Sequence, residues 1–77
     1  MTLNDLRPGE SAEVRSLLLE GAMLRRLLDL GLVENTKIKC LGRAPLGDPK
    51  AFLIRGSVIA LREEDCRRVA VRGETQP

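Results

Sequence analysis

Short runs of alternating polar and apolar residues, separated by residues that favour turns, place the strongest constraint on how this chain folds. Because successive side chains of a β-strand point to opposite faces, a period of two predicts strands with one buried face. The separating turns are expected at Pro8-Gly9, at Glu34-Asn35 and in the segment 42–49. The predicted strands are Glu10–Leu17, Thr36–Leu41, Lys50–Arg55, Ser57–Arg62 and Arg68–Val71. The residues predicted to face inward are Ala12, Val14, Ile38, Cys40, Val69 and Val71.

The segment Gly21–Leu30 has a helical period instead. At about 100° per residue its apolar side chains fall within one arc of roughly 160°, with charged residues on the opposite side. These apolar residues are Met23, Leu24, Leu27, Leu28 and Leu30. Gly31 and Leu32 follow in the order expected of a left-handed C-terminal cap. The sequence therefore predicts one α-helix, and its apolar arc is broader than a small sheet usually buries.

Short strands with one helix between the first and the second predict a mainly β fold. The chain has 77 residues, too few for two cores, so we expect one domain over residues 1–77 with a frayed tail at 73–77. Closing the sheet into a small barrel buries one face and removes exposed edges. The longest apolar runs, Ala51–Ile54 and Val58–Leu61, are far shorter than the roughly 18 residues of a membrane-spanning helix. Since the N-terminus has no apolar leader, the expected location is the cytoplasm.

The composition argues against an enzyme. The chain has no His, Trp or Tyr, and Phe52 is its only aromatic residue, so the commonest metal ligand and general base is missing. Cys40 and Cys66 lack the close spacing of zinc ligands, and we expect both to be small buried residues. The adjacent carboxylates of Glu63–Asp65 cannot all point one way, which favours a solvated turn over a cation site. We therefore predict no catalytic residue, no metal site and no cofactor.

The charge pattern is typical of a solvated surface. Thirteen Lys and Arg residues against 11 Asp and Glu leave a net charge of +2, and the two signs are interspersed. Nucleic-acid binders usually have a denser basic stripe, and the scarcity of aromatic residues disfavours base stacking. A small-barrel nucleic-acid-binding protein is therefore the alternative function. It would use the nearest approach to a basic patch, which is Arg55, Arg62, Arg67, Arg68 and Arg72.

The segment Gly42–Gly47 has the two-glycine spacing of a phosphate-binding loop. The next two positions, however, hold Asp48 and Pro49 where such a loop has Lys and Ser or Thr. A carboxylate at that position repels phosphate, which excludes nucleotide binding. The segment is predicted to be a rigid surface turn.

A protein-docking site is the remaining prediction. Some apolar side chains of the helix and of the proline-bracketed loop exceed what a small barrel buries. Pro45 and Pro49 restrict the free loop, so that binding costs little ordering entropy. The predicted site places this loop beside the edge of the helix and consists of Met23, Leu24, Arg25, Leu28, Pro45 and Leu46. The competing interpretation is that these residues belong to the core or to a self-association surface.

Several motifs, in their order along the chain, resemble the FeoA family. They are Leu6–Glu10, Arg25–Leu32, Ala44–Pro49, Arg55–Gly56 and Ile59–Arg62, and the resemblance covers residues 3 to 72. One departure is the turn Glu34-Asn35, where the family commonly has Pro-Gly, although asparagine also tolerates a turn with positive φ.

The resemblance implies an SH3-like β-barrel with a helical insertion. It also implies a non-catalytic accessory role in bacterial ferrous iron uptake, beside the FeoB transporter, a membrane protein with a cytoplasmic GTPase domain. The chain would then be peripheral to the membrane and bind the cytoplasmic part of FeoB, and nucleic acid would not be its partner.

Overall fold

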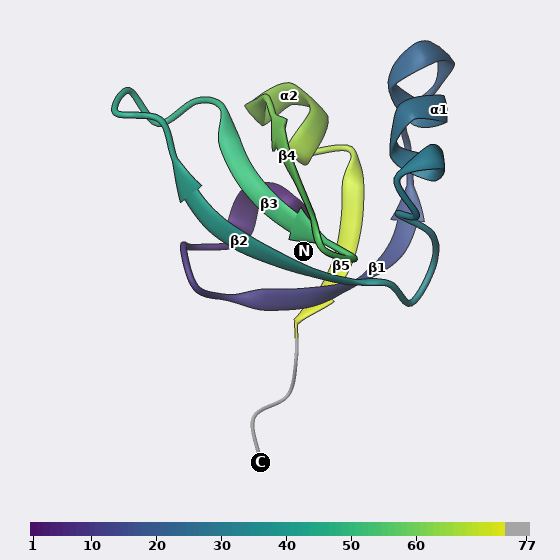
Figure 1. Cartoon of the computed structure of the whole chain (residues 1–77), viewed down its shortest axis with the longest axis horizontal. Helices are drawn as coiled ribbons and strands as arrows, with labels where there is room; N and C mark the ends of the chain where they lie inside the picture. The colour runs from purple at the N-terminus through teal and green to yellow at the C-terminus, as the bar shows by residue number, and fades with distance from the viewer. Residues whose placement is uncertain (74–77) are drawn as a thin grey trace.

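The computed structural model describes residues 1–73, which form one twisted antiparallel sheet with helices at its margins (Figure 1). The strands are β1 (Ser11–Leu17), β2 (Lys37–Arg43), β3 (Lys50–Ile54), β4 (Ser57–Leu61) and β5 (Val69–Gly73), in the spatial order β4-β3-β2-β1-β5. The helices are the 3₁₀ helix η1 (Leu3–Asp5), α1 (Gly21–Asp29) and the short α2 (Glu63–Cys66). The predicted mainly β fold, with one long helix between the first two strands, is confirmed.

The C-terminal end of the sheet differs from the expected tail by one residue. Gly73 is the last residue of β5 and pairs with Ala12 of β1. The other residues of the expected tail, 74–77, lie outside the described residues.

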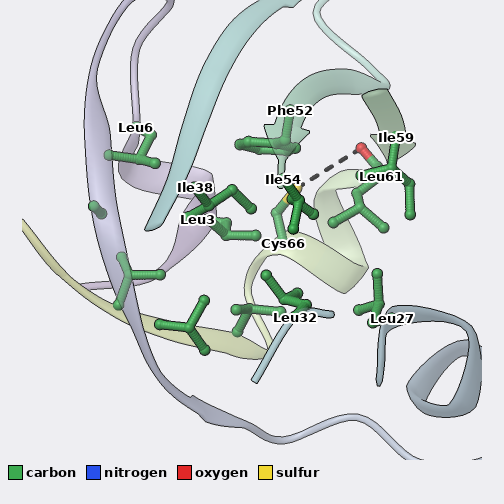
Figure 2. Close-up of a cluster of buried hydrophobic side chains, with 14 of the residues drawn as sticks. Leu3, Leu6, Leu27, Leu32, Ile38, Phe52, Ile54, Ile59, Leu61 and Cys66 are labelled. Carbon is green, nitrogen blue, oxygen red and sulfur yellow. Dashed lines mark hydrogen bonds between the residues drawn. The ribbon is translucent and has the colours of Figure 1, made fainter. Parts of the chain in front are cut away.

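The core lies on the inner face of the sheet (Figure 2). Every residue predicted to face inward is buried, with an exposed fraction of 3% or less. Phe52 of β3 is fully buried and pairs across the sheet with Cys40 of β2 and Ile59 of β4. Leu3 and Leu6 of the N-terminal segment are buried in the same cluster. The period-two pattern therefore identified the inner face correctly.

The barrel is open between β4 and β5, which do not pair within the described residues. Helix α2 connects these two strands, and the N-terminal segment covers the outer edge of β5. There Thr2 pairs with Ala70, and the Val71 N–H donates to the Met1 carbonyl at 2.9 Å. Helix α2 and the N-terminal segment, in place of a strand pair, therefore complete this small barrel between β4 and β5.

Residues predicted to form an acidic turn form helix α2 instead. The Asp48 Oδ1 accepts a hydrogen bond from the Glu63 N–H at 2.8 Å, so a residue of the β2–β3 loop caps this helix. Lys50, which is 8% exposed, donates from its Nζ to the Asn4 carbonyl at 2.6 Å and links β3 to the N-terminal segment. The cap comes from a distant part of the chain, which is why the local sequence indicated only a turn.

The C-terminal end of α1 matches its prediction. Gly31 has a φ of +93°, its N–H donates to the Leu28 carbonyl, and the Leu32 N–H donates to the Leu27 carbonyl, both at 2.9 Å. These two bonds form the Schellman cap that the order of glycine and leucine predicted.

No helix within residues 1–73 has both the length and the apolar character needed to cross a membrane.

The hairpin between β3 and β4 turns one residue earlier than the Gly56-Ser57 position suggested by the sequence. Its two turn residues are Arg55 and Gly56, with φ values of 48° and 85°, and Ile54 pairs with Ser57. A two-residue hairpin of this type requires positive φ at both central positions. Arg55 therefore adopts a backbone conformation that non-glycine residues rarely have.

Cys40 and Cys66 are free thiols that are both buried, in agreement with their prediction as small core residues. The pKa of the Cys66 thiol is raised from 9.0 to about 11, and burial is the largest cause. The Lys50 ammonium lowers this pKa, while the carboxylates of Asp48 and Asp65 contribute to raising it. The Cys66 Sγ donates to the Leu61 carbonyl at 3.7 Å (Figure 2).

This raised pKa predicts a loss of stability at high pH. Between pH 9 and pH 11 the unfolded chain releases the Cys66 proton while the folded chain retains it. The stability that the protonated Cys66 thiol contributes to the folded state is therefore complete below pH 9. Above pH 9 this stability decreases by about 1 kcal/mol per pH unit. The measurement is urea unfolding of the wild type and of Cys66→Ala from pH 8 to pH 10.5. The difference in unfolding free energy between the two proteins should decrease as the pH rises. A difference that stays constant over this range would contradict the prediction.

Candidate protein-binding surfaces

The exposed side of α1 is the first candidate surface. Leu27 is fully buried, whereas Leu28 is 44% exposed, and Met23 and Leu24 are half-buried against the core. Arg25 is exposed beside them. The sheet thus buries only the centre of the apolar arc, as its width suggested. We call Met23, Leu24, Arg25 and Leu28 the α1 surface.

The tip of the β2–β3 loop is the second candidate. Within this loop the Gly47 N–H donates to the Ala44 carbonyl at 2.7 Å, and the Ala44 N–H donates to the Pro49 carbonyl at 2.9 Å. Pro45 is exposed, and Leu46 is 97% exposed at the tip. Together with the Asp48 cap on α2, these bonds hold Leu46 in solvent on a defined turn. We call Pro45 and Leu46 the loop tip.

These two surfaces do not form one site. Figure 1 shows the β2–β3 loop and α1 at opposite ends of the longest axis of the molecule, which measures 35 Å. Helix α1 precedes β2 in the chain, and the β2–β3 loop follows the last residue of β2. The length of β2 therefore separates α1 from the loop. The predicted placement of the loop beside the helix edge is therefore wrong, while the exposure of Leu28 and Leu46 stands.

Two of the five arginines of the candidate basic patch, Arg67 and Arg72, are paired with carboxylates. The Arg67 guanidinium lies 2.7 Å from the Glu63 carboxylate, and that of Arg72 lies 2.6 Å from the Glu13 carboxylate. Both pairs are largely solvent-exposed, where such pairs add little stability but reduce the local positive charge.

Within the described part of the chain, no group of three or more His, Cys, Asp or Glu side chains is placed to hold a metal ion.

Comparison with known proteins identifies the family. The family model described as the FeoA domain matches residues 1–73. The chain belongs to the FeoA family. In the solution structure of FeoA from Chlorobium tepidum the fold is the same, with a TM-score of 0.92, 40% identity, and coverage of 97% of this chain and 71% of that one.

Other FeoA relatives agree on the fold. The crystal structure of Stenotrophomonas maltophilia FeoA in complex with zinc is described as an SH3 domain protein. It matches with a TM-score of 0.80 and 33% identity over 92% of this chain and 88% of that one. The chain is also 31% identical over 71 residues to an Fe(2+) transport protein A/Fe(2+) transporter FeoB fusion protein of Porphyromonas gingivalis. The match covers 92% of this FeoA chain but only 8% of that curated relative. The predicted family and the SH3-like fold are confirmed.

Sequence reasoning missed one further exposed surface of this FeoA chain, on the outer face of β2, β3 and β4. Val58 is 66% exposed and Leu41 is 43% exposed there. A signal was present in the sequence: Ala51–Ile54 and Val58–Leu61 are apolar without interruption. A strand with one solvated face alternates, whereas continuous apolar runs are typical of strands covered on both faces.

Proposed function

We propose that this FeoA-family chain is a non-catalytic accessory protein of ferrous iron uptake that binds the cytoplasmic part of a FeoB-type transporter. One observation carries the proposal, namely the relative that contains FeoA and FeoB in one polypeptide. Fusion holds two domains at a high effective concentration, which is useful when the two act together. The S. maltophilia relative is itself described as a candidate ferrous iron transport activating factor.

A binding role agrees with the chemistry of the chain. With no histidine and with both cysteines buried, the chain offers its partner apolar side chains and charges instead of a nucleophile or a general base. The location that goes with this role is the cytoplasmic face of the membrane, peripheral to the transporter.

The α1 surface and the loop tip are the proposed contacts with the transporter. Leu28 and Leu46 are large apolar side chains held in solvent on ordered elements, and burying them against a partner would remove apolar area from water. Because the two surfaces lie at opposite ends of the molecule, each is expected to contact a different part of the partner.

The test is calorimetric titration of the purified chain with the cytoplasmic portion of the FeoB-type transporter from the same organism. We expect Leu28→Asp and Leu46→Asp each to weaken binding about tenfold or more, since a central apolar contact contributes on that scale. Ala22→Asp, on the polar side of α1, is the matched control and should bind like the wild type. Circular dichroism establishes that each variant folds.

Two results would refute different parts of the proposal. If both leucine variants fold and bind with full affinity, the two surfaces are assigned wrongly. If the wild-type chain does not bind the transporter at all, the accessory function is wrong. Binding to duplex DNA that weakens steeply with salt would instead support the alternative of a nucleic-acid-binding barrel.

A further inference from the structure

The outer face of β2, β3 and β4 forms a continuous apolar row. In the register of the sheet Leu53 pairs with Val58, and Ala51 pairs with Ala60. The side chains of these residues point away from the core, because their neighbours along the strands are the buried ones. We call this surface the outer sheet face, consisting of Leu41, Ala51, Leu53, Val58 and Ala60.

This row is more apolar than a solvated strand needs. Single exposed apolar residues are common on protein surfaces, but a contiguous patch indicates an interaction site. The core covers the inner face of the same strands through Phe52, Ile54, Ile59 and Leu61. The continuous apolar runs in β3 and β4 thus provide side chains for a second covering layer.

One end of the outer sheet face is basic. A hollow of about 560 Å³ lies there. Among residues 1–73 its lining includes three exposed cations, Lys37, Lys39 and Arg55, and no carboxylate. Lys39 pairs directly with Leu53 in the sheet, so positive charge borders the apolar row. The remaining lining residues are uncharged: Ser11, Asn35, Thr36, Leu53 and Gly56.

The backbone fixes the position of Arg55 in this hollow. Arg55 occupies the two-residue turn between β3 and β4 with a φ of 48°. Its side chain lies over Gly31, where an added Cβ would come within 2.5 Å of the Arg55 Cδ. A residue other than glycine at position 31 would displace this side chain, so the end of α1 and the hairpin turn together place the guanidinium.

The other end of the face is mainly apolar. A second hollow of about 380 Å³ is lined there by Leu41, Gly42, Ala44, Pro49, Ala51 and Ala60, together with Arg43 and Lys50. The face therefore runs from a mainly apolar hollow beside the β2–β3 loop to a basic hollow at the β3–β4 turn. Five-residue strands span about 17 Å, which matches a short peptide segment.

We propose that the outer sheet face binds an acidic amphipathic segment of a partner protein. The apolar side chains of that segment cover Leu53, Val58 and Leu41, and its carboxylates meet Lys39 and Arg55. Charge complementarity selects an acidic occupant. The apolar row selects protein over nucleic acid, because no aromatic side chain is available on this face for base stacking: Phe52, the only aromatic residue of the chain, is buried. If the partner is the FeoB-type transporter, this inference rests on the proposed function.

The primary test does not involve the transporter. The probe is a synthetic amphipathic peptide of Glu, Leu and Ala, and its counterpart has Gln in place of every Glu. Titrated into the ¹⁵N-labelled full chain, the acidic peptide should shift the amide signals of β2, β3 and β4. It should bind at least tenfold more tightly than the Gln peptide, and added salt should weaken its binding.

Matched variants locate the binding. Lys39→Glu should weaken binding of the acidic peptide about tenfold, while Arg68→Glu, an equal charge change outside this face, should not. Val58→Asp should also weaken binding of the acidic peptide about tenfold. Its control is Leu18→Asp, because Leu18 is 67% exposed and Val58 is 66% exposed. If Val58→Asp fails to fold, Lys39→Glu still tests the site, because its side chain is exposed.

Several outcomes would overturn the inference. It is wrong if Lys39→Glu binds the acidic peptide like the wild type, or if the shifted signals cluster on α1. It is also wrong if vesicles of phosphatidylcholine with phosphatidylglycerol, or duplex DNA, bind more tightly than the peptide and lose affinity in the same variants. Failure of the wild-type chain to bind the transporter, with normal peptide binding, would refute the proposed function and leave the peptide site intact.

Discussion

Phe52→Ala is expected to remove about 3–5 kcal/mol of the folding stability of this chain. Phe52 is the only aromatic residue, it is fully buried, and it lies in the central part of the sheet between β2 and β4. Truncating a buried phenylalanine typically costs about 3–5 kcal/mol. A domain of this length has a total stability of about 4–12 kcal/mol. The variant should therefore be partly unfolded under mild conditions.

The measurement is the midpoint of urea unfolding, followed by circular dichroism. Leu53→Ala is the matched control, because Leu53 is adjacent in the same strand but points to the outer face and is only half-buried. Its midpoint should shift much less, by about 1 kcal/mol or below. Phe52→Leu should recover most of the loss, since it restores much of the volume. Equal shifts for Phe52→Ala and Leu53→Ala would show that the inner face does not dominate stability.

Leu27→Ala is expected to have the second largest effect, and its effect should be concentrated on α1. Leu27 is the one residue of α1 that is fully buried among the described residues, and it enters the same cluster as Leu32 (Figure 2). Removing a buried leucine side chain costs about 2–5 kcal/mol. The helix itself is short and has no side-chain hydrogen bond at its N-cap, Glu20. Without Leu27, α1 packs against the core only through the partly buried side chains of Met23, Leu24 and Leu30.

The control for this variant is its neighbour in the helix. Leu28→Ala removes the same atoms from a residue that is 44% exposed, so the stability should fall by less than about 1 kcal/mol. Hydrogen exchange adds a local measurement: amides of residues 21–29 should lose protection in Leu27→Ala while those of β2 and β3 retain most of theirs. Uniform loss of protection across the sheet would contradict the assignment of Leu27 as the anchor of α1.

Much of the fold was predictable because its causes are local. Whether a residue such as Val14 or Ile38 faces inward depends only on its place in an alternating run. The end of α1 at Gly31 depends on the two residues that follow the helix. The motifs that resemble the FeoA family are likewise contiguous stretches, and the family match over residues 1–73 confirmed them.

What only the tertiary structure decided involves residues that are distant along the chain. Helix α2 forms where Asp48, from another loop, caps Glu63. The α1 surface and the loop tip were expected to adjoin, yet they lie at opposite ends of the molecule because β2 runs between them. The outer sheet face exists only because the register places Leu53 beside Val58 and Lys39. Pattern and capping are set by neighbouring residues, whereas surfaces are set by strand order and register, which the packing of the whole chain determines.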